Sequence, residues 1–248
     1  MAQWTYYANV DFTQAHNRDD AMIRIGFKPN DGSWSFVGTD AERIKRGQVT
    51  MNLACIADRP TVSDRDRGII LHEWGHALGL AHEHQSPARR GTLTLDQNNT
   101  YTYYRRVERL SDDQIKSQIL EMENVNDVSS YSTLDITSIM MYSMPSCINT
   151  EGISVPVNNE LSDMDKAYIF INYPRKEPHP NAKDWTLKRA LTVAGVPAKE
   201  IVAYLGLDDE GIRRDFNAWN ILQRDQELSE PSIYAQSTGE KCADEGTR

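Results

Sequence analysis

The alternation of apolar and polar residues predicts three β-strands near the start of the chain. They are residues 21–27 (AMIRIGF), 33–38 (SWSFVG) and 48–54 (QVTMNLA). A hydrophobic period of two residues is typical of a strand with one buried face. The glycine and aspartate residues between the segments favour turns. The pattern therefore indicates a small sheet.

After the third strand the hydrophobic period changes to that of a helix. Ser63 is a good N-cap and the acidic Asp66 follows three positions later, which is a variant of the capping box. Asp64 and Asp66 also suit the positive end of a helix dipole. Apolar side chains follow at Ile69, Ile70, Leu71, Trp74, Ala77 and Leu78. We therefore expect a buried helix that begins after Ser63.

Further along the chain, helical patterns alternate with loops. Helices are expected in residues 98–109, 112–123 and 161–174, the last with its following turn. Breaker residues and polar clusters indicate loops at 86–97 and 124–137.

The composition changes after residue 174. Residues 175–183 contain two prolines and mixed charge, which indicates a linker. Three short helical patterns follow, at 184–194, 197–205 and 208–222. Residues 223–248 are polar and are expected to be disordered. The sequence thus predicts a large domain over 1–174, the linker, and a small helical accessory unit over 184–222.

The run HEWGHALGLAHE carries the candidate chemistry. His72 and His76 are four residues apart, so they share one helix face. Gly79 permits a left-handed C-cap, after which His82 can return as a third nitrogen ligand. Three protein ligands and a bound water are typical of a catalytic zinc, whose water has a pKa near ~7. Glu73 is adjacent to the first histidine and is expected to reach that water.

The alternative is that these histidines are ordinary helix residues without a metal. A short HExxH motif alone leaves that alternative open. The added glycine and third histidine at fixed spacing favour zinc.

The motif resembles that of the metzincin metalloproteases, and Glu83 directly after the third histidine resembles the astacin branch. The segment 138–142 (SIMMY) is similar to the astacin Met-turn, Ser-Ile-Met-His-Tyr. This resemblance implies that Met140 lies beneath the zinc site and that Tyr142 swings between the metal and the tetrahedral intermediate. Met141 replaces a histidine that is not a zinc ligand in that family.

The resemblance covers about residues 4–174 and implies an α+β fold, with a mixed β-sheet and an active-site helix. The opening strand and most of the first helix have no counterpart, so we expect an N-terminally shortened catalytic domain in which 4–10 is the end of that helix as it enters the next strand. In the family, the last strand before the active-site helix is an edge strand that pairs with substrate. The residue matching Glu83 contacts the mature N-terminus there. Here Glu83 is expected to have another partner or to be a solvated helix-end carboxylate.

These residues together predict a zinc endopeptidase acting on protein or peptide substrates. His72, His76 and His82 would bind zinc, Glu73 would act as general base, and Tyr142 would stabilise the oxyanion. The alternative is a catalytically inactive zinc-binding or interaction module derived from a metzincin. We expect a monomer.

Composition limits the remaining possibilities. The formal charge of −9 argues against nucleic-acid binding. No apolar run approaches the ~20 residues of a membrane span, and no signal peptide is recognisable. The three cysteines permit a Cys55–Cys147 bridge or two buried free thiols, with Cys242 as the third. The family resemblance favours an extracellular location, whereas the cysteine count and the missing signal do not.

Several aromatic residues and histidines lie outside the motif. Tyrosines 101, 103 and 104 are expected to pack rather than to line a substrate cleft. His84 is expected to face solvent, although contact with the site is the alternative. His16 and His179 are interpreted as surface residues.

Overall fold

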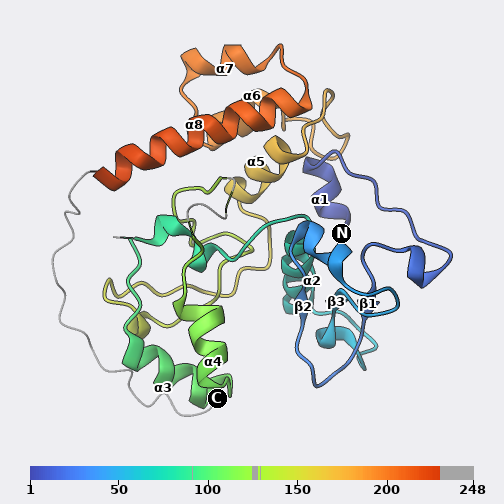
Figure 1. Cartoon of the computed structure of the whole chain (residues 1–248), viewed down its shortest axis with the longest axis vertical. Coiled ribbons are helices and arrows are strands. Elements are labelled where there is room, and N and C mark those ends of the chain that lie inside the picture. Colours follow the sequence, from blue (N-terminus) through green and yellow to red (C-terminus); the bar gives the residue numbers. More distant parts are fainter. Residues whose placement is uncertain (91, 125–127, 129, 230–248) are drawn as a thin grey trace. The chain divides into compact units, whose positions relative to one another are not determined.

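The computed structural model describes residues 1–90, 92–124, 128 and 130–229 (Figure 1). The chain divides into two compact units. The first contains Met1–Ala81, Ser138–Met140 and Asn158–Phe216. The second contains the described parts of 82–137, 141–157 and the chain after Phe216. The elements of each unit are described separately below.

The sheet of the first unit has three short strands, β1 (Ile25–Gly26), β2 (Trp34–Ser35) and β3 (Met51–Asn52). β1 is parallel to β3 and β2 is antiparallel to it, so the predicted mixed sheet is confirmed. The strands are shorter than predicted because side chains replace part of the backbone ladder. The amide of Asn52, for example, accepts from the N–H of Lys28 at 2.9 Å and donates to its carbonyl at 3.0 Å.

The strand order corrects one expectation. Among the described strands the order is β1-β3-β2, so β3, the last strand before the long helix, is central. The family-based expectation that this strand lies at an edge is therefore wrong. Met51 pairs with Ile25 on one side and with Ser35 on the other. β1 and the antiparallel β2 occupy the two edges of the described sheet.

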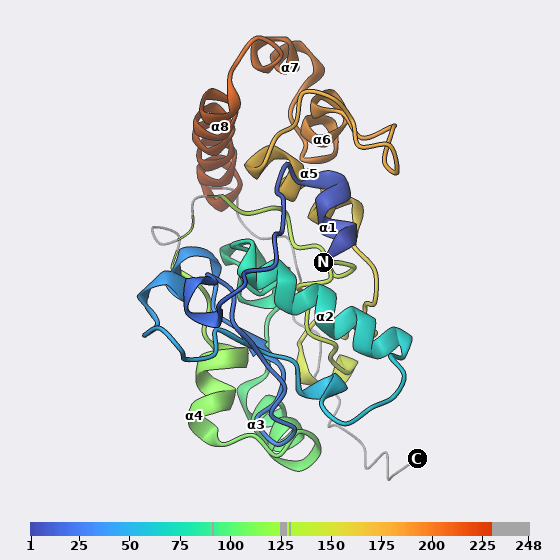
Figure 2. The ribbon, with the colours of Figure 1, turned by 90° about the vertical axis from the view of Figure 1, so that its right-hand side faces the viewer.

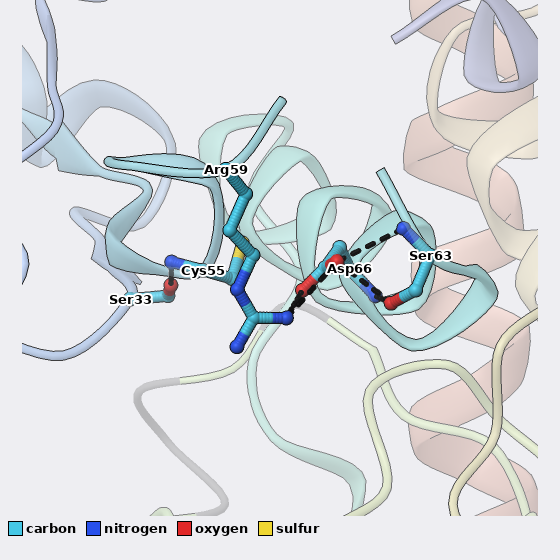
Figure 3. Close-up of polar contacts among 5 residues, drawn as sticks. All are labelled: Ser33, Cys55, Arg59, Ser63 and Asp66. Carbon is cyan, nitrogen blue, oxygen red and sulfur yellow. Dashed lines mark hydrogen bonds and ion pairs between the residues drawn. The ribbon is translucent and has the colours of Figure 1, made fainter. Parts of the chain in front are cut away.

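Helix α2 (Asp64–Ala77) begins with the predicted capping box. The Ser63 hydroxyl accepts from the Asp66 amide at 3.2 Å, and the Asp66 carboxylate accepts from the Ser63 amide at 2.9 Å (Figure 3). Arg59 lies 3.4 Å from the same carboxylate. These contacts fix the start of the helix and hold the pKa of Asp66 below its usual range, with the hydrogen bonds from Ser63 as the main cause.

Helix α1 (Ala2–Tyr7) packs against α2. The indole N–H of Trp4 donates to the Leu71 carbonyl at 2.9 Å, and Trp4 is completely buried. Residues 8–10 form no strand, so the expectation that this helix leads directly into one is wrong. The core of this unit contains Trp4, Ala8, Met51, Leu53, Leu71, Trp74, Leu78, Ile139, Met140, Leu161 and Ile169.

The C-terminal helices occupy the predicted positions. They are α5 (Asp163–Asn172), α6 (Leu187–Val193), α7 (Ala198–Tyr204) and α8 (Asp209–Ser229). α5 contacts both α1 and α6 (Figure 2). Rings of Tyr7 and Trp185 meet edge to face at 5.4 Å beside this contact.

Two predictions about the C-terminal region need comment. α8 extends past its predicted end at Leu222, so the expected disordered tail is helical as far as Ser229. Residues 230–248 lie outside the described part of the chain. The assignment of 184–222 as a separate accessory unit stays a prediction; within the first unit, α6 packs on α5.

The second unit contains α3 (Gln97–Val107) and α4 (Asp112–Ile115), which continues as a π-helical turn, η6 (Lys116–Leu120). Both predicted helices are confirmed, although the second ends at Leu120. The core of this unit contains Leu93, Tyr104, Ile115, Ile119, Met141, Met144, Ile148 and Val155. Tyr104 is 3% exposed, which confirms its packing role.

The cysteines differ in state. Cys55 is a half-buried free thiol, so the predicted option of a Cys55–Cys147 bridge is wrong. The Cys55 amide donates to the Ser33 hydroxyl at 3.3 Å (Figure 3), and burial raises the pKa of its thiol. Cys147 is disulfide-bonded, so two free thiols are also excluded. Cys242 lies outside the described residues. Among the described residues, none of the helices combines the length and the apolar composition that a membrane span requires.

Candidate metal centre

Helix α2 presents His72 and His76 on one face, with their ring centroids 4.7 Å apart. The helix ends as predicted at a left-handed glycine, Gly79, whose φ is 99°. The Gly79 amide donates to the His76 carbonyl at 2.8 Å, and the Leu80 amide donates to the Gly75 carbonyl at 3.0 Å. This pair of hydrogen bonds is the Schellman motif. It reverses the chain immediately before His82.

His72, His76 and His82 offer ligand nitrogens that all lie within 4.8 Å of one another. This spacing suits three ligands of one ion, because zinc–nitrogen bonds are about 2.0–2.1 Å long. The predicted grouping of the three histidines is therefore present, and it can hold a metal ion.

Backbone carbonyls orient the first two imidazoles. His72 Nδ1 lies 2.8 Å from the Ile139 carbonyl oxygen, and His76 Nδ1 lies 2.8 Å from that of Leu80. A carbonyl oxygen only accepts, so each Nδ1 must carry the proton. The opposite nitrogen, Nε2, is then the one with a lone pair for a cation. This arrangement is common behind metal-binding histidines.

Burial also favours the neutral form of His72. It lowers the pKa of His72, which favours the neutral imidazole that a metal requires. Glu73 is 5% exposed, and burial raises its pKa to about 8. Its Oε2 atom is buried without a hydrogen-bond partner in the described chain. An orphaned buried oxygen on the residue that follows His72 fits a site that holds a polar group or an ion.

The third imidazole is oriented by a side chain. His82 Nδ1 lies 2.8 Å from Oε1 of Gln85. The Gln85 amide nitrogen donates to the carbonyls of Ser117 and Glu121, at 2.8 and 3.2 Å. Gln85 was not recognisable from the sequence as part of the site, because its partners lie 32 and 36 residues away along the chain.

The turn at Ser138–Met140 is held by α5. The Asp165 carboxylate accepts from the Ser138 hydroxyl at 2.6 Å and from the Ile139 amide at 2.8 Å. The same residue forms the capping box of α5 with Ser162. Met140 is 2% exposed and belongs to the core of the first unit. The capping box is visible in the sequence, but the contacts of Asp165 with the turn are not.

Tyr142 and His84 surround His82 in the second unit. The Tyr142 ring meets the His82 ring at 4.6 Å, with an interplanar angle of 65°. His84 is completely buried, its Nε2 lies 2.8 Å from the Gln118 carbonyl oxygen, and its ring lies 4.6 Å from that of Tyr142. The expectation that His84 faces solvent is therefore wrong, because it packs between polar and aromatic partners.

Glu83 has partners of its own. One carboxylate oxygen accepts from the Asp135 amide at 2.8 Å and from the Ser132 hydroxyl at 3.2 Å. The option of a solvated helix-end carboxylate is therefore wrong, and the expectation of another partner is confirmed. The contact fastens the segment that precedes Ser138 to the residue that follows His82.

The mixed sheet, the helix with two histidines and the third histidine after a glycine turn define the class of zinc metalloproteases. The family model of the astacin peptidases matches residues 1–166. The chain belongs to the astacin family. Members of this family are zinc metalloproteases, which agrees with the group of three histidines.

Two relatives support the assignment. The chain is 32% identical over 126 residues to zinc metalloproteinase nas-12 of Caenorhabditis elegans. The aligned segment covers 50% of this chain and 27% of that protein. The match thus spans about a quarter of the relative's length. The solved structure of myroilysin superposes with a TM-score of 0.64 at 34% identity, covering 70% of this chain and 82% of myroilysin.

Proposed function

We propose that the chain is a zinc-dependent endopeptidase that hydrolyses peptide bonds of protein or peptide substrates. The observation that carries the proposal is that the three imidazoles make the same kind of hydrogen bond. In each of His72, His76 and His82, Nδ1 faces an oxygen at 2.8 Å. The ligand nitrogens of the three rings lie within 4.8 Å of one another, which suits zinc.

His72, His76 and His82 would hold the zinc, which would supply Lewis acidity toward a peptide carbonyl and toward water. Glu73 is the candidate for the general base. It follows His72 on α2 and has an unused buried oxygen. It would take a proton from the attacking water and later deliver it to the leaving amine. Burial raises the pKa of this carboxyl, so that its ionised form is a stronger base than an exposed carboxylate.

Tyr142 is the candidate for oxyanion stabilisation. Its ring is held against the His82 and His84 rings, both at 4.6 Å. These ring contacts with the third proposed ligand and its neighbour support a role in which the Tyr142 hydroxyl would donate to charge that develops on the carbonyl oxygen.

Met140 would provide a rigid floor for the site. In the first unit its sulfur lies so close to α2 that a Cβ added to Gly75 would be 2.5 Å from it. A glycine in a helix interior costs about 1 kcal/mol relative to alanine. The close approach of Met140 explains why Gly75 is nevertheless suitable here.

We also propose an extracellular location and a monomeric state. Members of the astacin family are mostly secreted. The disulfide-bonded state of Cys147 supports the same compartment, because disulfides persist in oxidising environments.

Hydrolysis of casein or gelatin tests the proposed activity. We expect cleavage that stops when a chelator removes the metal and returns when zinc is added. A protein that binds zinc but cleaves neither casein, nor gelatin, nor any of a panel of peptides would instead support the inactive zinc-binding module.

A further inference from the structure

The segment that follows His82 is attached to the π-helical turn η6 by side chains. Gln85 is 8% exposed, and its amide nitrogen donates to the carbonyls of Ser117 and Glu121. The backbone carbonyl of Gln85 accepts from the Glu123 amide at 2.8 Å. The side chain and the backbone of Gln85 are therefore both fixed by the same stretch of chain.

Neighbouring residues complete this attachment. Arg89 is 6% exposed and donates to the carbonyls of Ile119 and Leu120, at 3.3 and 2.8 Å. His84 Nε2 lies 2.8 Å from the Gln118 carbonyl oxygen. The carbonyls at the end of η6 thus accept from three buried side chains. A cation near the C-terminal end of a helical turn is also favoured by the helix dipole.

The attachment determines the orientation of the Gln85 amide. Two carbonyl oxygens face one end of the amide, so that end must be the NH2 group, since carbonyls only accept. The other end, Oε1, then faces His82 Nδ1 at 2.8 Å. A flipped amide would place oxygen against the carbonyls of Ser117 and Glu121. Because Oε1 only accepts, the proton of neutral His82 must lie on Nδ1.

We propose that Gln85 is a positioning residue for His82, with η6 as its anchor. Gln85 selects the Nδ1–H tautomer of His82 and holds the plane of its ring, so that Nε2 is presented to the cation. The inference rests on the proposed function of His82 as a zinc ligand. It adds the backbone carbonyls of residues 117–121 to the groups that shape the site.

The tautomer of His82 in metal-free protein tests this directly. The ¹⁵N chemical shifts of the two ring nitrogens distinguish Nδ1–H from Nε2–H at a pH where the imidazole is neutral. We expect Nδ1–H to dominate in the parent protein. A parent protein in which Nε2–H dominates would overturn the proposal without any reference to zinc or activity.

Substitutions separate the acceptor role of Gln85 from its structural role. Gln85→Met removes both the acceptor for His82 and the donors to η6. We expect loss of the Nδ1–H preference and a zinc affinity weakened about 10–100-fold, as for other residues that orient metal-binding histidines. Gln118→Met is the matched control, because Gln118 takes part in the attachment only through its backbone carbonyl and its side chain is exposed on η6. It should change neither quantity.

Gln85→Glu is the decisive variant, and it also serves if the methionine variant does not fold. It retains an oxygen for His82 but loses both donor bonds to η6, so its melting temperature should fall. The proposal predicts that Nδ1–H persists and that zinc affinity changes by less than about tenfold. If Gln85→Glu lost as much zinc affinity as Gln85→Met, or if the affinity of the variants fell in proportion to their melting temperatures, the role of Gln85 would be merely structural.

Zinc affinity is measured by chelator competition, with the parent protein in parallel. A parent that binds no zinc contradicts the proposed function. A parent that binds zinc, together with a Gln85→Met variant of unchanged affinity and unchanged tautomer, contradicts the role of Gln85 alone.

Discussion

The Oδ2 atom of Asp165 lies 2.8 Å from the amide nitrogen of Ile139. The carbonyl of Ile139 in turn lies 2.8 Å from Nδ1 of His72. Ile139 therefore joins a buried carboxylate on α5 to an imidazole on α2. Asp165 is 6% exposed, so little water is available to replace it.

Asp165→Asn should loosen this connection. Asparagine has a single side-chain oxygen, and its NH2 group cannot accept a hydrogen bond. It therefore cannot replace both carboxylate oxygens, which accept from Ser138 and Ile139, and at least one buried donor loses its partner. We expect a loss of about 1.5–3 kcal/mol in the free energy of unfolding, the usual contribution of a hydrogen bond to a charged group. Zinc affinity should fall as well, because the Ile139 carbonyl orients His72.

Denaturant unfolding of metal-free protein and chelator competition measure the two effects. Asp163→Asn is the control on the same helix, since its carboxylate is exposed and pairs with Lys166 at 3.0 Å. Surface pairs contribute little. Equal losses in the two variants would contradict a specific role for Asp165.

Gly75→Ala should destabilise the protein although alanine favours helices. The added Cβ would lie 2.5 Å from the Met140 sulfur and 3.2 Å from the Trp4 ring. Overpacking of a core typically costs about 1–3 kcal/mol, which exceeds the helix propensity gained. Gly206→Ala is the control, because nothing lies within 4 Å of a Cβ there. A Gly75→Ala variant at least as stable as the parent in thermal unfolding would refute the close approach of Met140.

Asp66→Asn should change the pH dependence of stability. Hydrogen bonds from Ser63 hold the pKa of Asp66 below its ordinary value. The stabilisation is therefore present above the unfolded-state pKa of about 4 and is lost as pH falls through the lower folded-state pKa. Melting temperatures of parent and variant should differ at pH 7 and converge at acid pH. A difference that stays constant down to about pH 2, below both pKa values, would argue against the ionised capping box.

Tyr142→Phe should lower kcat with little change in KM. The substitution keeps the ring that packs on His82 and His84 and removes only the hydroxyl, which is proposed to act in the transition state. Steady-state kinetics on one peptide substrate measures both parameters. A raised KM at unchanged kcat would assign Tyr142 to substrate binding instead.

Local patterns in the sequence predicted the parts of the site that depend on neighbouring residues. The helix start at Ser63, the left-handed Gly79 and the spacing of the histidines all follow from short-range geometry, and the structure contains each of them. A period of about 3.6 residues and the preference of glycine for positive φ suffice for these predictions.

The remainder depends on contacts between distant segments. The central place of β3 is set by pairing with two strands, which the alternation within each strand does not specify. The burial of His84 and the partners of Glu83 depend on segments 34 and 52 residues away along the chain. A single sequence does not distinguish a polar side chain that is buried from one that is exposed.

Glu73→Gln tests the central claim most directly, with zinc content and peptide hydrolysis measured on the same samples. The glutamine is nearly isosteric and Glu73 is not one of the three proposed ligands. We therefore predict about one zinc per chain, as in the parent, and turnover lowered about 10²–10⁴-fold. His76→Ala, the control on the same helix, should lose both zinc and turnover. A Glu73→Gln variant that cleaves peptides at the parent rate would contradict the account.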